Sequence, residues 1–133
     1  MDSQELRVTT GGRLVTDITA AVSGFCAERG DGLVNVFIPH ATAGVALMET
    51  GSGSEEDLAQ TIERLWPRAA GYAHRHGSPG HGRDHVVPAF VAPSVTLPVL
   101  AGQIALGTWQ SIVLVDSNVD NPDRRVRLSF VVG

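Results

Sequence analysis

The chain has 133 residues, a formal net charge of −4, and ten basic residues that are all arginine. This length suits one domain, residues 1–133, which can bury roughly two-thirds of its unfolded surface. The acidic balance gives no reason to expect a nucleic-acid partner, and the absence of lysine excludes a Schiff-base or P-loop lysine.

Cys26 is the only cysteine, which excludes an intramolecular disulfide and a cluster of thiolate ligands. It falls in an apolar helical pattern, and we interpret it as a small buried hydrophobic residue. The N-terminal residues lack the apolar core of a signal peptide, and no apolar run approaches the ~20 residues of a membrane span. We therefore expect a cytoplasmic protein without a membrane partner.

The first predicted elements are two short strands and a helix. Gly11 and Gly12 separate two runs, residues 5–10 and 14–16, which is typical of a β-hairpin. Asp17 is placed to cap the helix that follows, and Gly30 is placed to end it. The apolar stripe of this helix consists of Ile18, Ala21, Val22, Phe25 and Cys26.

Two more strands and a second helix come next. The nearly continuous apolar run at residues 33–38 predicts a strand buried on both faces. Residues 43–49 predict another strand, which ends in the carboxylate of Glu49. Ser54 and Asp57 have the spacing of a capping box, so a helix is expected from there to Pro67. Its buried stripe is expected to be Leu58, Ile62, Leu65 and Trp66.

Residues 72–85 hold four of the five histidines together with three glycines and a proline, so mostly irregular backbone is expected. Residues 86–92 predict a short helix. Antiparallel strands are predicted over residues 94–100, 102–115 and 125–132. The pattern as a whole predicts an α+β domain with an antiparallel sheet and more strands than helices.

Thr108 and Gln110 interrupt the apolar face of the strand predicted over residues 102–115. Burying such groups without partners costs about 1–3 kcal/mol each, so hydrogen bonds are expected. A structural network or subunit interface and a ligand-facing polar patch explain them equally well. Gly107 within the strand predicts a bulge or a close approach of two backbones.

One motif is specific enough to suggest a family. The sequence Gly-Thr-Trp-Gln at residues 107–110 follows the run SVTLPV at residues 94–99 and Gly102. The segments HATA at residues 40–43 and YAH at residues 72–74, together with Glu49, His85 and Arg124-Arg125, occur in the matching order. In these features the whole chain resembles the YjbQ-like family.

The resemblance implies a compact α+β sandwich with two to three helices that assembles as a homotrimer, with polar sites near the subunit boundaries. The family is often described as a secondary thiamine-phosphate synthase, which is a transferase activity. The resemblance carries over His40, His74 and His85 as site histidines, with Glu49 beside them. The further residues that it carries over for substrate or anion binding are Thr42, Ser94, Thr108, Gln110, Arg124 and Arg125.

Two departures from the family pattern affect the substrate contacts. Ala41 stands where the family commonly has a threonine beside the first histidine, so one hydroxyl is missing. The residues before His85 also differ, and here include Asp84, which could orient a histidine or pair with Arg83.

Three histidines with an open fourth position are typical of a catalytic zinc site, in which bound water is acidified to a pKa of about 7. His40, His74 and His85 are therefore the expected ligands of a divalent metal, zinc in preference, with Glu49 and His40 as catalytic residues. The same imidazoles could instead bind phosphate or sulfate, with Arg124 or Arg125 nearby. His76 and His81 are interpreted as solvated loop residues.

These observations predict a metal- or anion-binding protein that acts weakly on phosphate compounds, as a thiamine-phosphate synthase or a metal-dependent hydrolase. The chain has no Asp-rich magnesium motif, so synthase activity is expected to be a side activity. The alternatives are a non-catalytic module that binds a small anionic metabolite and a structural metal site at a trimer interface.

Overall fold

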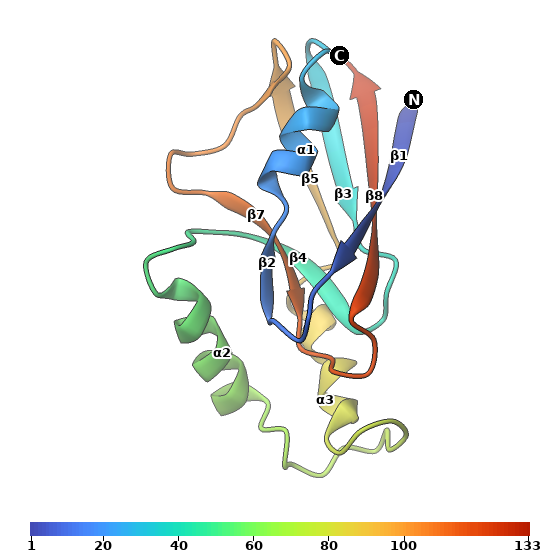
Figure 1. Cartoon of the computed structure of the whole chain (residues 1–133), viewed down its shortest axis with the longest axis vertical. Coiled ribbons are helices and arrows are strands. Elements are labelled where there is room, and N and C mark those ends of the chain that lie inside the picture. Colours follow the sequence, from blue (N-terminus) through green and yellow to red (C-terminus); the bar gives the residue numbers. More distant parts are fainter.

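The computed structural model describes all 133 residues, and two antiparallel sheets pack face to face within it (Figure 1). The larger sheet has the strand order β1 (Asp2–Thr9), β8 (Asp123–Val132), β3 (Gly32–Phe37), β5 (Ser94–Leu100) and β6 (Gln103–Ile104). The smaller sheet has the order β2 (Val15–Asp17), β7 (Ser111–Asp116) and β4 (Ala43–Met48). The expected antiparallel α+β sandwich is thereby confirmed.

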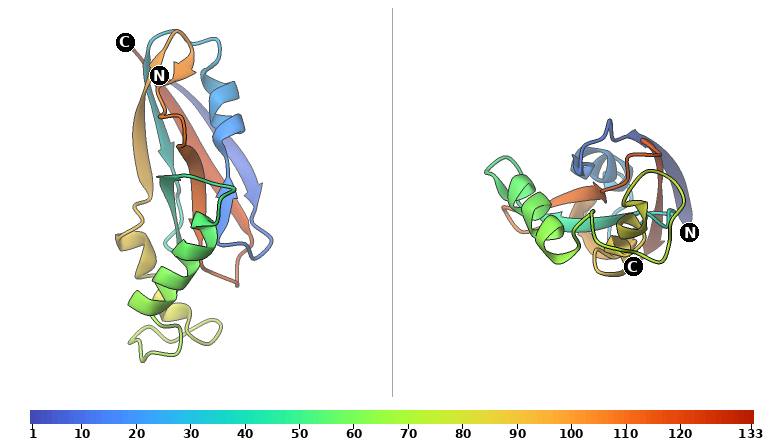
Figure 2. Two further views of the ribbon diagram at one scale, coloured as in Figure 1. Left: turned by 90° about the vertical axis from the view of Figure 1, so that its left-hand side faces the viewer. Right: turned by 90° about the horizontal axis from the view of Figure 1, so that it is seen from below.

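The helices lie at opposite ends of the sandwich. Helix α1 (Thr19–Cys26) covers one end of the core, while α2 (Ser54–Leu65), α3 (His81–Asp84) and the 3₁₀ turn η1 (Val87–Ala89) lie toward the other end (Figure 2). None of these helices combines the length and the apolar character that crossing a lipid bilayer requires.

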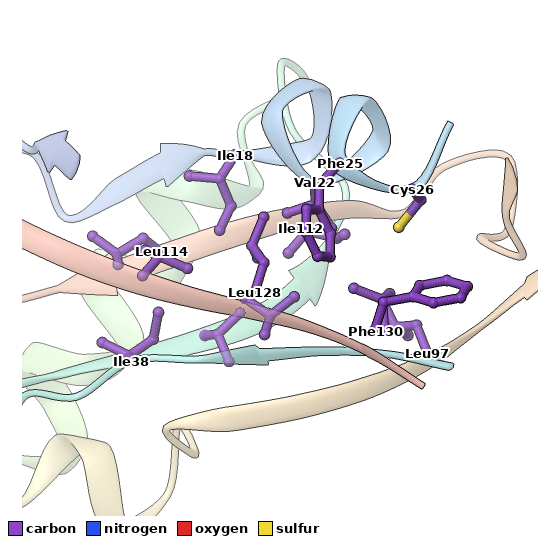
Figure 3. Close-up of a cluster of buried hydrophobic side chains, with 14 of the residues drawn as sticks. Ile18, Val22, Phe25, Cys26, Ile38, Leu97, Ile112, Leu114, Leu128 and Phe130 are labelled. Carbon is purple, nitrogen blue, oxygen red and sulfur yellow. The ribbon is translucent and has the colours of Figure 1, made fainter. Parts of the chain in front are cut away.

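The main core fills the space between the two sheets and α1 (Figure 3). Alternate residues of β8 point inward, as the two-residue period of a strand requires, and Leu128 and Phe130 are both fully buried. They meet side chains from the smaller sheet, such as Ile112 and Leu114, and from α1, such as Val22 and Phe25. Burial of apolar surface stabilises a fold by about 25 cal/mol per Å², and this cluster of 16 buried residues is the larger of the two apolar clusters.

Strand β7, and not β3, is the strand buried on both faces. Val113 and Val115 of β7 pack on the far side of the smaller sheet against Ile62 of α2 and Val87 of η1. The prediction that residues 33–38 are buried on both faces is wrong, because Leu33 is 47% exposed and its neighbours alternate in burial. Strand β3 belongs to the five-stranded sheet, and its outward-facing Leu33 and Phe37 are exposed.

The predicted hairpin at Gly11-Gly12 is also wrong. Strand β1 pairs with β8, whereas β2 pairs with β7 in the other sheet. The two glycines, with φ of 61° and 78°, make a turn that carries the chain from one sheet to the other. Sequence alone shows such a turn but not which strand each flank will choose as its partner.

The long strand predicted over residues 102–115 is interrupted. It ends at Ile104, and a turn at Gly107 intervenes before β7 begins at Ser111. The Gln110 amide N–H donates to the Gly107 carbonyl (3.0 Å), and the Gly107 N–H donates to Gln110 Oε1 (2.8 Å). Thr108 and Gln110 are therefore exposed turn residues and do not interrupt a buried face.

The helix ends differ in detail from the predictions. The N-cap of α1 is Ile18 and not Asp17, although Asp17 Oδ1 accepts from the Thr19 N–H (2.9 Å), and the helix ends at Cys26, before Gly30. Helix α2 begins at Ser54 without a capping box; instead the carboxylate of Glu55 accepts from the N–H of Gly51 (3.0 Å). Two residues expected in buried stripes, Ala21 and Leu65, are exposed, and the helix predicted over residues 86–92 shortens to η1.

Candidate metal centre

The segment between α2 and α3 forms a loop at the end of the sandwich away from α1 (Figure 1). Close packing within it depends on Gly82: a Cβ there would lie 2.5 Å from Tyr72 Cβ and 2.7 Å from the His74 carbonyl oxygen. The absence of a side chain lets α3 close onto residues 72–74. This folding brings together four imidazoles, hereafter the histidine cluster, whose ligand atoms all lie within 4.8 Å of one another: His74, His76, His81 and His85.

His81 is the best-held member of the cluster. Its Nδ1 lies 2.8 Å from the Asp120 carboxylate, and its Nε2 lies 2.9 Å from His85 Nε2. Because a carboxylate oxygen can only accept, the contact with Asp120 assigns the proton to Nδ1 and leaves a lone pair on Nε2. That lone pair is directed at the other imidazoles, which is the orientation that a metal-ligating histidine takes when a carboxylate holds its second nitrogen.

Asp84 is completely buried beneath the cluster. It accepts from Ser117 Oγ (2.8 Å), Asn118 Nδ2 (3.2 Å) and Arg68 Nη2 (3.2 Å). Asn118 Nδ2 also lies 2.9 Å from His81 Nδ1, but an amide NH₂ cannot bond to a ring nitrogen that carries the proton, so Asn118 packs against His81 without orienting it. Of the two roles expected for Asp84, pairing with Arg83 is minor, because Arg83 Nε is 3.8 Å away and Arg83 Nη1 donates to Glu63 (2.7 Å).

The electrostatics of the cluster favour neutral imidazoles. Burial, and then the neighbouring histidines, lower the pKa of His74 and of His85 below 6.5. The backbone N–H of Ser78, and then His81, lower the pKa of Asp120, which is therefore ionised at neutral pH. His74 Nδ1 is buried without a hydrogen-bond partner. The cluster thus offers unprotonated nitrogens beside a fixed carboxylate.

His40 does not belong to this cluster. It follows β3, and its Nε2 accepts from the Arg125 backbone N–H (2.9 Å). Within one chain the expected set of His40, His74 and His85 is therefore not brought together, while His76 and His81, interpreted above as solvated, join the cluster. The spacing of His81 and His85, four residues apart, was the available signal, because such residues lie on one face of a helical turn.

Glu49 also lies apart from the cluster. It is exposed and follows Met48, which pairs with Ser111, whereas the other end of β4 pairs with Asp116. A strand of this length spans about 20 Å. The cluster contacts Asn118, which directly follows the Asp116 end, so Glu49 lies at the opposite end of β4.

The residues expected to bind an anion do not form one site, although Thr42, Arg124 and Arg125 lie together. Arg124 is buried in a bidentate pair with Asp116 (2.7 and 2.8 Å) and donates to Thr42 Oγ1 (2.9 Å). Ser94 Oγ accepts from Asn35 on the outer face of the larger sheet (2.8 Å). Thr108 and Gln110 lie in the exposed turn before β7, and Arg125 is exposed next to Arg124.

Comparisons with known proteins agree with the motif-based resemblance. A family model described as UPF0047 protein YjbQ-like matches residues 4–133. A UPF0047 protein of Mycobacterium tuberculosis is 64% identical over 133 residues, which are 100% of both chains. A UPF0047 protein of Archaeoglobus fulgidus is 36% identical and is matched over 91% of this chain and 94% of its own. The crystal structure of a hypothetical protein from Aeropyrum pernix has a TM-score of 0.90 at 29% identity, with 100% of each chain covered.

Proposed function

This chain belongs to the YjbQ-like UPF0047 family, and we propose that it binds one divalent transition-metal ion, zinc in preference, through the histidine cluster. The observation that carries the proposal is the convergence of four imidazoles with ligand atoms within 4.8 Å of one another. Imidazole nitrogen suits zinc, copper, iron and nickel, whereas calcium and magnesium prefer oxygen ligands. Zinc is favoured because it binds four nitrogen donors in a tetrahedral arrangement and has no redox chemistry of its own.

Three features of the cluster support a cation. Asp120 holds the Nδ1 of His81, so that Nε2 is free to bind. The buried Nδ1 of His74 has no partner in the chain, and a ligated ion is one way to satisfy such an atom. The lowered pKa values of His74 and His85 keep these imidazoles neutral, as metal binding requires.

Hydrolysis of a phosphate compound is the reaction class that we propose for this site. His76 is exposed and adjoins Gly77, whose φ is 81°, so it is the donor most readily replaced by water. A bound zinc ion would supply a water with a pKa of about 7 at that position. His74, His81 and His85 would hold the ion, and Asp120 would fix the orientation of His81. Glu49 would serve as the base only from a neighbouring copy of the chain.

A structural metal site is the second candidate. It is favoured by the presence of a fourth imidazole, because four protein donors close a tetrahedral site, whereas catalytic zinc sites keep one position open. The two candidates differ in solvent access: His76→Ala should increase turnover of a phosphate ester by a catalytic site, and should only weaken metal retention by a structural one.

Elemental analysis of untagged protein tests the metal proposal directly. We expect about one zinc ion per chain, loss of most of it in His85→Ala and His81→Ala, and full retention in His40→Ala. His76→Ala removes an exposed ligand and should preserve the fold, which circular dichroism would verify. Metal content unchanged in all three cluster variants, or lost equally in His40→Ala, would overturn the assignment.

Chelator-sensitive hydrolysis of 4-nitrophenyl phosphate tests the reaction class. We expect activity that EDTA removes and zinc restores, and that His81→Ala lacks. Thiamine-phosphate synthase activity is a separate proposal, which complementation of a synthase-deficient strain would test. The homotrimer is likewise proposed, and light scattering should give three chains per particle.

A further inference from the structure

Two arginines face each other on the outer surface of the larger sheet with no adequate counter-charge. Arg7 of β1 is directly opposite Arg125 of β8, and both side chains are exposed. Like charges in directly opposite positions of an antiparallel pair are destabilising. No ion pair in the structure includes Arg7, and Arg125 reaches only Glu5, at 4.0 Å. Glu5 is itself closer to Arg127, at 3.3 Å.

These arginines line a depression of about 510 Å³, the arginine pocket, which is formed by Arg7, Val8, Thr9, Asp123, Arg124 and Arg125. The Arg124 charge is already neutralised by the buried carboxylate of Asp116. The one acidic group of the wall, Asp123, accepts from Thr9 Oγ1 (3.3 Å) and forms no ion pair. The pocket therefore sets the two guanidinium charges of Arg7 and Arg125 against the single carboxylate of Asp123, which leaves an excess of one positive charge.

His40 adds a neutral donor beside Arg125. Because its Nε2 accepts from the Arg125 backbone N–H, the proton of the neutral ring is on Nδ1, which can donate. Burial, and then the charges of Arg124 and Arg125, lower the pKa of His40 below 6.5, so the ring is neutral at pH 7. His40 is not among the residues that form the arginine pocket, so the donors of the pocket itself are the guanidinium groups of Arg7 and Arg125.

We propose that the arginine pocket binds the phosphate group of a small phosphorylated molecule. Guanidinium groups form bidentate hydrogen bonds with phosphate, and a bridging anion would convert the repulsion between Arg7 and Arg125 into attraction. The volume lies within the range of small-molecule pockets. No residue of this pocket belongs to the histidine cluster, so the site is separate from the proposed metal centre and does not depend on it.

Isothermal titration of the full chain with pyrophosphate, at fixed chloride concentration, tests the proposal. We expect one site per chain, and at least a tenfold loss of affinity in Arg7→Gln and in Arg125→Gln. Arg7→Lys should retain part of the affinity, because it keeps the charge but not the bidentate geometry. The matched control is Arg64→Gln on α2, which removes one exposed positive charge elsewhere and should leave the affinity unchanged.

Two outcomes would overturn the proposal. If Arg64→Gln weakened pyrophosphate binding as much as Arg7→Gln, the effect would be one of net charge. If His81→Ala or EDTA abolished binding while Arg7→Gln left it intact, pyrophosphate would be bound at the metal centre. Arg7→Gln breaks no side-chain hydrogen bond or ion pair and should not lower the melting temperature, so loss of binding in this variant reports on the pocket itself.

Discussion

At the scale of single residues, the contact between Asp120 and His81 matters most for the proposed metal centre. It lies outside the loop that carries the histidines, because Asp120 belongs to the connection between β7 and β8. A second carboxylate, Asp84, is buried below the cluster and accepts from the Asn118 amide. The orientation of the imidazoles is thus determined by residues distant in sequence, about 40 positions away in the case of Asp120.

Asp120→Asn should lower the metal affinity about 10- to 100-fold, because the amide neither fixes the tautomer of His81 as firmly nor raises its basicity. Competition with a chromophoric chelator would measure the change. Asp123→Asn is the control, since it removes an exposed carboxylate three residues away that does not contact the cluster. Equal affinities of Asp120→Asn and the native chain would show that Asp120 does not position a ligand.

His40 should make stability depend on pH in a predictable direction. Its pKa in the folded chain is below 6.5, so the folded state binds fewer protons than the unfolded state as the pH falls below 6.5. Stability should therefore decrease from pH 6.5 downward and be unaffected by His40 above it. The difference in the free energy of unfolding between pH 7.5 and pH 5.5, measured with urea, should be smaller in His40→Gln than in the native chain. The glutamine side chain can still accept from the Arg125 N–H. An unchanged pH dependence in His40→Gln would contradict this origin.

At the scale of elements, β4 is constrained by the close approach of the segment that precedes β5. A Cβ at Gly44 would lie 2.0 Å from the Val91 carbonyl oxygen, and the contacting atom is backbone that cannot move aside. The same segment is held by the hydrogen bond from the Val45 N–H to the Ala92 carbonyl (2.9 Å). Only glycine fits between the smaller sheet and this connection.

Gly44→Ala should reduce the free energy of unfolding by about 1–3 kcal/mol or more, as overpacking of a close contact does. Gly24→Ala provides the matched comparison, because Gly24 is exposed in α1 and no atom lies within 4 Å of the added Cβ. That change should stabilise the protein by about 0.5–1 kcal/mol through helix propensity. Chemical denaturation should show that the free energy of unfolding falls in Gly44→Ala and rises in Gly24→Ala. A lower value in Gly24→Ala would contradict the packing argument.

At the scale of the whole molecule, the buried pair of Arg124 and Asp116 connects the two sheets. Arg124 belongs to β8 of the larger sheet, Asp116 to β7 of the smaller, and Thr10 Oγ1 also donates to Asp116 (3.4 Å). Both charged side chains are almost completely buried, so each needs the opposite charge of the other to offset its loss of hydration. The pair also lies between the two proposed sites. Arg124 lines the arginine pocket, and Asp116 accepts from the N–H of Asn118 (3.0 Å), which lies beside the histidine cluster.

Asp116→Asn should lower the free energy of unfolding by about 3–5 kcal/mol, because it leaves the Arg124 charge buried without its partner. Arg127→Gln, which breaks an exposed pair with Glu5, should change it by less than about 1 kcal/mol. Urea denaturation would compare the two. A small effect of Asp116→Asn would mean that water reaches Arg124 and that the pair does not hold the sheets together.

The local order of elements could be predicted from the sequence, because it depends on neighbouring residues. The runs at residues 94–100 and 125–132 alternate or are β-branched, and both are strands. The Gly-Thr-Trp-Gln motif pointed to the family whose model matches the chain, even though its interpretation as part of a strand was wrong. Which residues carry side chains capable of binding metal was also evident from composition.

Only the tertiary structure decided which of these residues meet. Strand pairing is a long-range choice, so the assignment of β1 and β2 to different sheets could not follow from the turn between them. The same holds for the candidate site: the packing of Gly82 against Tyr72 and the contact of Asp120 with His81 bring His76 and His81 into the cluster, while His40 lies beside Arg125. Sequence determined the chemical groups available to this chain, and the fold determined their partners, because partners are set by contacts between residues far apart in the chain.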